Sequence, residues 1–178
     1  MKKIVTLFFA ALVTVSCGSR KQMQANRDRD NAIRNAILKE LSSDFRGRNT
    51  QFVNNLLRDA EQYTGTPYKL GGNDKSGLDC SGLICQVFDK NKIKMPRRSA
   101  DQAKQGTEVH ISNAKPGDLV FFATNGGNTV SHVGIVHDVL KNGEVTFIHA
   151  STSKGVMISS LNEAYWNRAF LFVRRIGI

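Results

Sequence analysis

The sequence predicts an α+β fold in which N-terminal helices pack on an antiparallel sheet of five to six strands. Two observations carry this prediction. Apolar residues recur at helical spacing in the N-terminal half of the chain, and short strand-like segments separated by turn signals fill the C-terminal half. Helices first and antiparallel strands later is the usual α+β order. The sequence contains no internal repeat or low-complexity tract.

The N-terminus has the features of a bacterial export signal. A positive pair, Lys2-Lys3, precedes the apolar stretch 4–15, which is short for a membrane span. The stretch ends at Ser16-Cys17 in a form similar to a lipoprotein processing site, although Thr14 stands where leucine is usual. We expect residues 1–16 to be a signal peptide and Cys17 to carry the lipid. The alternative is an ordinary secretory signal cut near Ser16, with Cys17 left as a free thiol.

The chain is strongly basic, with a formal net charge of +10. Much of the excess positive charge lies between residues 17 and 50, where there are eight basic residues and four acidic ones. A basic segment behind a lipid anchor favours anionic lipid headgroups or an anionic polymer such as the cell wall. A solvated cationic linker is the alternative that this composition also fits. An exported protein rarely meets nucleic acid, so we expect no nucleic-acid partner.

Removal of the signal leaves about 160 residues, which suits one domain with one hydrophobic core. We expect a polar tether and a helix in residues 17–48, and a single folded domain, monomeric, in residues 49–178. Within the first segment, residues 18–30 are polar and residues 31–41 carry apolar side chains at helical spacing. A second helix is predicted to begin near Thr50.

The most informative segment places a cysteine between a glycine-rich loop and an apolar helix. The loop at residues 71–77 leads to Cys80, after which apolar residues follow at helical spacing: Leu83, Ile84, Val87 and Phe88. A thiol at a helix N-terminus lies at the positive end of the helix dipole, which favours the nucleophilic thiolate. Asp79 is a preferred N-cap residue for this helix. Because Ile84 and Val87 share the side of Cys80, we expect the thiol to point toward the sheet.

Cys80 is predicted to be unpaired. Cys85 lies five residues further along the same helix, so the two Cα atoms are about 8 Å apart, whereas a disulfide needs less than about 7 Å. An unpaired cysteine at a helix start in an exported protein indicates a thiol kept for its reactivity. Cys85 is interpreted as a small core residue.

The C-terminal half contains a short helical stretch at residues 99–105 and then five predicted strands. Turn signals rich in Gly, Asn and Pro separate them. The strands are expected at residues 118–122, 130–139, 144–149, 155–160 and 170–175.

A cysteine nucleophile needs a histidine base, and strand parity selects two of the four histidines. His132 and His137 are five residues apart on one strand, so they point to opposite faces. A two-residue turn at Asn142-Gly143 would place His149 on the face of His132. The alternative interpretation of His149 is a partly buried side chain that only packs.

The same turn would also separate the two histidines. His149 would lie four residues along from His132, about 13 Å away at the usual strand rise. A direct contact requires a longer loop centred on Leu140-Lys141, or a bulge. We expect the longer loop.

Several ordered motifs together resemble the NlpC/P60 family of cell-wall cysteine peptidases over roughly residues 55–175. The family's nucleophile motif corresponds to Asp79-Cys80-Ser81-Gly82, and its base motif to the Ser-His-Val-Gly-Ile sequence at 131–135. Further matches are His149-Ala150, Pro96-Arg97-Arg98-Ser99, the Pro-Gly-Asp-Leu-Val-Phe sequence at 116–121, and Tyr68. With the lipoprotein-like start, the chain looks most like the small murein endopeptidase lipoproteins of Gram-negative bacteria.

This resemblance implies a papain-like fold and a thiol peptidase acting on peptidoglycan stem peptides or crosslinks. Cys80 would be the nucleophile, His132 the base and His149 the residue that orients the base. Tyr68 would line the site near the oxyanion, or else pack under the glycine loop. Asp79 and Ser81 would contact the substrate, with helix capping as the alternative role of Asp79. The resemblance implies no cofactor or metal, and a periplasmic protein held by its lipid at a membrane, expected to be the outer one.

Alternatives from other classes remain at this point. A non-catalytic peptidoglycan-binding module would keep the fold without the reaction, and an amidase or acyltransferase would use the same scaffold for other products. Arg97 and Arg98 either meet a carboxylate of the stem peptide or are simply solvated. A phosphate-binding loop at residues 71–76 is rejected because its glycine spacing is wrong. A zinc site fits no standard ligand spacing. The sequence does not select between a γ-D-glutamyl bond and a D-alanyl crosslink.

Overall fold

In the computed structural model, the backbone is described for residues 15–177 and the side chains for residues 20–41 and 49–177. The chain divides into two compact units, Met1–Arg48 and Asn49–Ile178. Residues 1–14 of the signal peptide expected at residues 1–16, and the side chains of residues 15–19, Cys17 included, lie outside these described parts. No helix among the described residues is long and apolar enough to cross a membrane.

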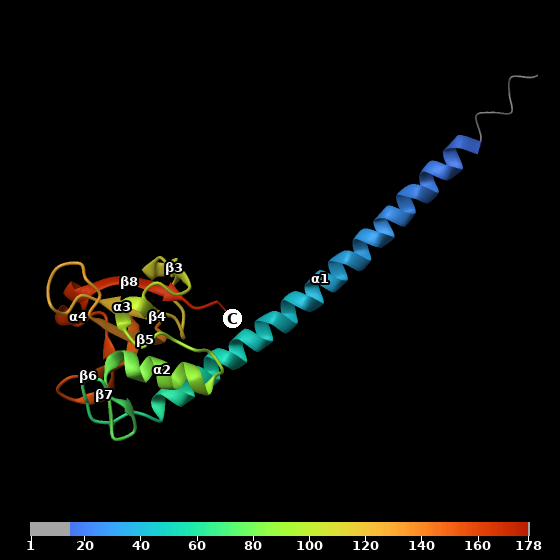
Figure 1. Cartoon of the computed structure of the whole chain (residues 1–178). Helices are drawn as coiled ribbons and strands as arrows, with labels where there is room; N and C mark the ends of the chain where they lie inside the picture. Colours follow the sequence, from blue (N-terminus) through green and yellow to red (C-terminus); the bar gives the residue numbers. More distant parts are fainter. Residues whose placement is uncertain (1–14, 178) are drawn as a thin grey trace, which may run out of the picture. The chain divides into compact units, whose positions relative to one another are not determined.

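Helix α1 (Val15–Glu61) corrects the prediction of two helices preceded by a polar tether. The backbone is helical throughout, from before Cys17 to Glu61 (Figure 1). Residues 20–46 contain neither glycine nor proline and are rich in Arg, Lys, Gln, Ala and Leu, which favour helix. Polarity alone therefore does not indicate a break in the helix. Gly65, with a φ of +81°, follows the end of α1, as expected for a residue that ends a helix.

The C-terminal unit confirms the predicted α+β fold. Its six-stranded sheet is antiparallel throughout, in the order β3-β8-β4-β5-β6-β7 (Figure 1). The strands are β3 (Thr107–Val109), β4 (Leu119–Phe122), β5 (His132–Val139), β6 (Val145–Ser151), β7 (Gly155–Ser160) and β8 (Phe170–Arg175). All five predicted strands are present, and β3 adds the sixth at the edge.

Short elements complete this unit. A two-stranded hairpin, β1 (Asn73–Asp74) with β2 (Gly77–Leu78), precedes α2 (Cys80–Lys90). The others are α3 (Ser99–Gln102), the 3₁₀ helix η1 (Ile111–Asn113) and α4 (Ala164–Ala169).

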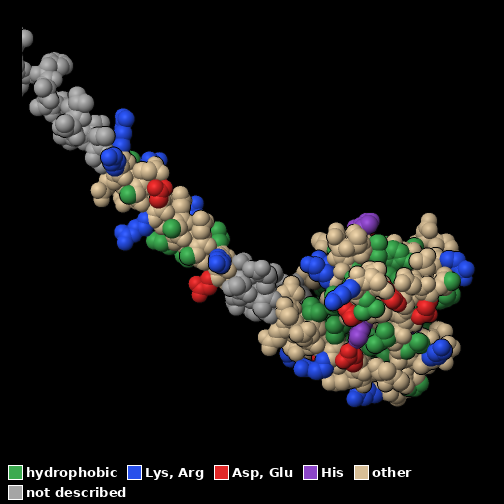
Figure 2. Space-filling view, turned by 180° about the vertical axis from the view of Figure 1, so that it is seen from behind, with side chains coloured by type: hydrophobic (Ala, Val, Ile, Leu, Met, Phe, Trp, Pro, Cys, Tyr) green, Lys and Arg blue, Asp and Glu red, His purple; other side chains and the backbone are tan. Residues whose placement is uncertain are grey.

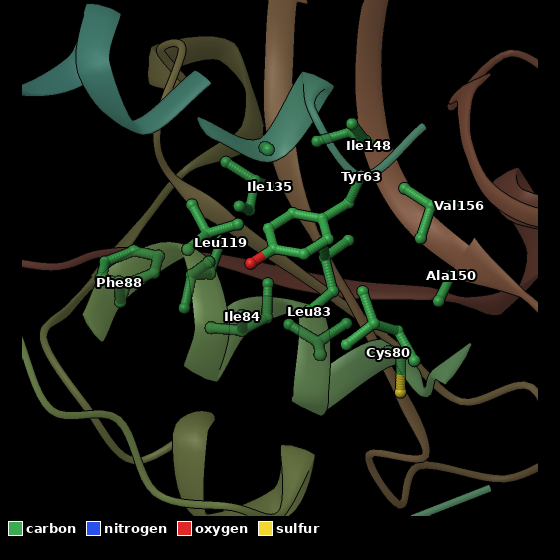
Figure 3. Packing of buried hydrophobic residues seen from close by; sticks show 14 of the residues in the cluster. Tyr63, Cys80, Leu83, Ile84, Phe88, Leu119, Ile135, Ile148, Ala150 and Val156 are labelled. Atoms are coloured by element: carbon green, nitrogen blue, oxygen red, sulfur yellow. The ribbon is translucent and has the colours of Figure 1, made fainter. Parts of the chain in front are cut away.

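Apolar side chains cover both faces of the sheet. One cluster joins α2 to β4, β5 and β6, and its members include Leu83, Ile84, Val133, Ile135 and Ile148 (Figure 3). A second cluster on the opposite face packs α4 against the sheet, with Val120, Phe122, Phe147 and Trp166. Figure 3 shows Cys80 at the margin of the first cluster, with its sulfur directed away from the labelled apolar side chains.

Charged side chains are dispersed over the C-terminal unit. On the face shown in Figure 2, lysines and arginines are spread among acidic and apolar side chains and do not gather in one basic patch. Helix α1 exposes apolar side chains along part of its length. Four of them are more than half exposed: Ile33, Ile37, Leu38 and Leu41.

Candidate active site

The loop before Cys80 is built so that the helix begins at the thiol. Strands β1 and β2 turn the chain back, and Asp79 adopts an extended conformation at the N-cap of α2. Its Oδ1 accepts a hydrogen bond from the backbone N–H of Gly82 at 2.7 Å, which confirms the predicted cap. A Cβ on Gly82 would lie 2.1 Å from the carbonyl oxygen of Gly72. Glycine is therefore required there for the helix to approach the loop.

Arg97 holds this turn together. Its guanidinium donates to Asp79 Oδ1 at 2.9 Å and Oδ2 at 2.7 Å, to Ser81 Oγ at 2.9 Å and to the carbonyl of Gly72 at 3.2 Å. Burial works against the charged form of Asp79, but the hydrogen bonds from Arg97 and Gly82 outweigh it and hold the pKa of Asp79 below its usual range. Of the two alternatives given for Arg97, simple solvation does not describe it, because its side chain folds back onto the nucleophile loop.

The thiol of Cys80 is more protonated than its position at a helix start predicts. The residue is only 8% exposed. Burial raises the pKa of the Cys80 thiol, against the backbone N–H groups of Val133, Ser81 and Cys80, which favour the thiolate. Val133 directly follows His132, so the sulfur lies against the strand that carries the histidine. Desolvation, which favours the neutral thiol, is thus the largest influence on this group and opposes the helix-start effect that favours the thiolate.

His132 and His149 contact each other directly. Nε2 of His132 lies 3.0 Å from Nδ1 of His149, and the ring planes meet at 79°. Burial lowers the pKa of His132 to about 4 and that of His149 to about 3. Both rings are therefore neutral at neutral pH. No hydrogen bond joins either ring to the Cys80 sulfur among the described side chains.

The register that permits this contact differs from both predicted registers. Leu140 and Glu144 close a three-residue loop, with Gly143 at a φ of +82°. A bulge between Val136 and Asp138 then changes the pairing of β5 with β6 by one more residue. Because Ile135 pairs with Ile148, His149 stands opposite Gly134, and it reaches His132 diagonally. The expected loop centred on Leu140-Lys141 was wrong. The loop has one residue more than the predicted two-residue turn, and this residue and the bulge together bring His149 opposite Gly134.

A serine and a tryptophan that the sequence analysis missed complete the histidine pair. Nε2 of His149 lies 3.1 Å from Ser159 Oγ on β7. Trp166 of α4 stacks on the His132 ring, with centroids 5.1 Å apart, and meets the His149 ring edge-on at 4.6 Å. No local motif marks either residue. The place of Ser159 beside His149 can be recognised only once the β6–β7 register is known. The place of Trp166 can be recognised only from the packing of α4.

The remaining site residues lie around Cys80. Tyr68, Asp79, Ser81 and Arg98 line a cavity of about 450 Å³ together with Cys80. Tyr68 also packs against the core cluster. Burial first, and then the nearby Cys80 and Asp79, raise the pKa of its hydroxyl.

His132 and His149 open instead onto a second cavity, of about 280 Å³, next to Trp166. Within the described part of the chain, no three His, Cys, Asp or Glu side chains are grouped to hold a metal ion.

This arrangement is that of a papain-like α+β domain, with a helix-borne cysteine beside a histidine on the adjoining strand. The NlpC/P60 family model matches residues 65–175, and the chain belongs to this family. It is similar to the Probable endopeptidase NlpC of Escherichia coli K12, with 45% identity over 117 residues, which are 65% of this chain and 73% of that protein.

Two further comparisons place the chain in the same group. The Murein DD-endopeptidase MepS/Murein LD-carboxypeptidase of Escherichia coli K12 is 38% identical over 130 residues, 72% of this chain and 65% of that protein. A solved NLP/P60 family structure from Staphylococcus aureus, titled as similar to lipoprotein, has 36% identity and a TM-score of 0.62. That match covers 72% of this chain but only 42% of the longer Staphylococcus chain.

Proposed function

We propose that this protein is a peptidoglycan endopeptidase that cleaves amide bonds of stem peptides or crosslinks with Cys80 as nucleophile. The printed names of its relatives, which include murein endopeptidases, support the substrate. The observation that carries the chemistry is the hydrogen bond between His132 Nε2 and His149 Nδ1. It occupies one nitrogen of His132 and leaves Nδ1 as the base.

The two histidine contacts allow two sets of tautomers, and the proposed role of His132 requires one of them. In that set, His149 donates its Nε2–H to Ser159 Oγ, and its Nδ1 accepts the Nε2–H of His132. The lone pair of a neutral His132 is then on Nδ1. A base in this state takes the proton of a neutral thiol, which agrees with the directions in which burial shifts the pKa values of Cys80 and His132.

The reaction proceeds in two halves. The Cys80 proton moves to His132 Nδ1 as the sulfur attacks the amide carbonyl, and the backbone N–H of Cys80 is a candidate donor to the oxyanion. His132 then gives that proton to the departing amine, which leaves a thioester on Cys80. Water, deprotonated by His132, cleaves the thioester and restores the thiol.

Digestion of purified peptidoglycan tests this function. The wild type should release peptide fragments that Cys80→Ala and His132→Ala do not release, with the products identified by mass spectrometry. The fragment masses also identify the scissile bond and separate an endopeptidase from an amidase or acyltransferase. Binding to peptidoglycan without any release by the wild type would instead indicate a non-catalytic wall-binding module and would refute the proposal.

We also propose that lipidation of Cys17 holds the protein in the periplasm at the outer membrane. The positive n-region, the apolar stretch and the Ser16-Cys17 sequence support this. Membrane fractionation of the wild type and of Cys17→Ser, with intact mass of the mature chain, tests it. We expect an acylated protein in the outer-membrane fraction and a soluble variant. An unacylated wild type cut near Ser16 would contradict the anchor.

A further inference from the structure

The cavity beside Cys80 has an unequal distribution of charge. Three charged residues line it, Asp79, Arg97 and Arg98, and its other lining residues are uncharged at neutral pH. The charge that a substrate meets depends on which of these three groups is already engaged within the protein.

Asp79 and Arg97 neutralise each other. Asp79 Oδ1 accepts from Gly82, Ser81 and Arg97, and its Oδ2 accepts from the backbone of Gly71 at 2.9 Å and from Arg97. Both terminal nitrogens of Arg97 make two hydrogen bonds each. A carboxylate with five donors offers little to a substrate ammonium group. This pair therefore contributes structure rather than net charge to the cavity.

Arg98 is the third charged residue, and its side chain interacts with Asp101 only through the electrostatic field by which it lowers the pKa of that carboxylate. Its side chain is exposed, and it makes no hydrogen bond or ion pair with any residue that the structure describes. The nearby carboxylate of Asp101 is paired with Lys104 at 3.0 Å. The backbone of Arg98 is fixed, because its carbonyl accepts from Asp101 and Gln102 at 3.0 Å each, and Gln102 Nε2 donates to Pro96 at 2.7 Å. The backbone of Arg98 is thus held at the cavity rim, and its guanidinium is exposed there.

The two cavities divide the substrate between them. The departing amine has to receive its proton from His132, which opens onto the cavity beside Trp166. The acyl part of the substrate, which becomes attached to Cys80, accordingly lies in the cavity with Arg98. A planar guanidinium binds a carboxylate through two parallel hydrogen bonds, a geometry that a carboxamide cannot reproduce.

We propose that Arg98 is a specificity-determining residue that selects substrates with a free carboxylate in the acyl-side peptide. The inference rests on the proposed peptidase function and adds a substrate class to it. Stem peptides in which this carboxylate is converted to a carboxamide would be poor substrates for the same active site. Peptide bonds without a nearby acyl-side carboxylate would be poor substrates for the same reason.

The test compares one peptide in two forms. A crosslinked muropeptide is prepared with its acyl-side carboxylates free or amidated, and kcat/KM is measured for the full-length protein. Variants are Arg98→Gln, Arg98→Lys and, as a matched control, Arg168→Gln, an exposed arginine that lines neither cavity. We expect the wild type to prefer the free carboxylate about tenfold, mainly through KM, as one charged hydrogen-bonded contact would give.

The outcomes separate the two proposals. Arg98→Gln should cleave both forms at the rate of the amidated one, Arg98→Lys should keep part of the preference, and Arg168→Gln should keep all of it. Equal kcat/KM for the two forms in the wild type, or an undiminished preference in a folded Arg98→Gln, would overturn the role of Arg98. A wild type that cleaves neither form would contradict the peptidase function itself.

Discussion

His132 carries the chemistry of the site because its two ring nitrogens have different neighbours. Nε2 is held by His149 at 3.0 Å, and His149 is held in turn by Ser159 at 3.1 Å. Trp166 stacks on the His132 ring and shields this hydrogen bond from water. A hydrogen bond in a low-dielectric environment is electrostatically stronger than one in water. In the proposed mechanism, these neighbours hold His132 in the tautomer that leaves Nδ1 available to the thiol.

Ser159→Ala should lower kcat about 2- to 10-fold and leave KM unchanged, because one neutral hydrogen bond contributes about 0.5–1.5 kcal/mol. Ser159 orients His149 and does not touch the reacting atoms, so Ser159→Thr, which keeps the hydroxyl, should restore most of kcat. Steady-state kinetics with a thermal unfolding midpoint for each variant measures both. A loss in Ser159→Ala that Ser159→Thr does not recover would indicate a role in packing only.

The buried histidines also make stability depend on pH. An unfolded histidine has a pKa near 6.5, whereas burial lowers the pKa of His132 to about 4 and of His149 to about 3 in the folded protein. As the pH falls below 6.5, the unfolded chain takes up protons that the folded chain does not. The contribution of these buried neutral histidines to the free energy of unfolding is therefore complete above pH 6.5. It is lost as the pH falls toward 4, by about 1.4 kcal/mol per pH unit for each histidine.

Urea unfolding of the wild type and of His149→Asn between pH 7 and pH 4 measures this effect. The slope of the unfolding free energy against pH should be smaller in the variant. Equal slopes in the two proteins would show that His149 is not buried in its neutral form.

At the scale of elements, the β5–β6 hairpin decides whether the site assembles. The bulge between Val136 and Asp138 and the three-residue loop bring His149 opposite Gly134. A Cβ on residue 134 would lie 2.7 Å from the Phe147 ring and 3.3 Å from His149 Cβ. Glycine at this position therefore lets β6 approach β5 with the Phe147 ring and the His149 Cβ close to residue 134.

Gly134→Ala should therefore displace His149, reduce kcat at least about tenfold and destabilise the fold by about 1–3 kcal/mol, the usual range for overpacking. Gly177→Ala is the control, because a Cβ there meets nothing within 4 Å. Full activity in Gly134→Ala would mean that the histidine contact is not needed for turnover.

Much of this domain could be predicted from the sequence, and the exceptions have physical causes. The strands, the Cys80 helix and its Asp79 cap follow from local patterns. The hairpin register does not, because an Asn-Gly sequence fits both a two-residue turn and a three-residue loop with glycine in the left-handed region. The bulge, Ser159 and Trp166 depend on tertiary packing. The protonated thiol reflects burial, which outweighs the helix dipole and cannot be seen in a sequence.

At the scale of the whole molecule, the core and the candidate site belong to the C-terminal unit, Asn49–Ile178. The last turns of α1 are part of that core, because Leu56 and Ala60 are fully buried. His137 on β5 also contacts Glu61 at the end of α1, at 2.7 Å.

A fragment of residues 49–178 should keep the unfolding midpoint and the soluble-muropeptide activity of the full-length protein. A fragment of residues 62–178 should be destabilised by about 2–5 kcal/mol or more, because it lacks the buried Leu56. Thermal unfolding and kcat/KM on a soluble substrate measure both. Loss of activity in a well-folded 49–178 fragment would show that the N-terminal helical residues take part in the reaction.

The central claim is that Cys80 becomes covalently attached to the acyl part of a peptidoglycan peptide. Rapid acid quenching during turnover, followed by intact-mass and peptide mapping, tests it most directly. The wild type should carry a thioester-linked stem-peptide fragment on the peptide that contains Cys80, and Cys80→Ala should carry none and release no product. Product release by Cys80→Ala at the wild-type rate would contradict the account.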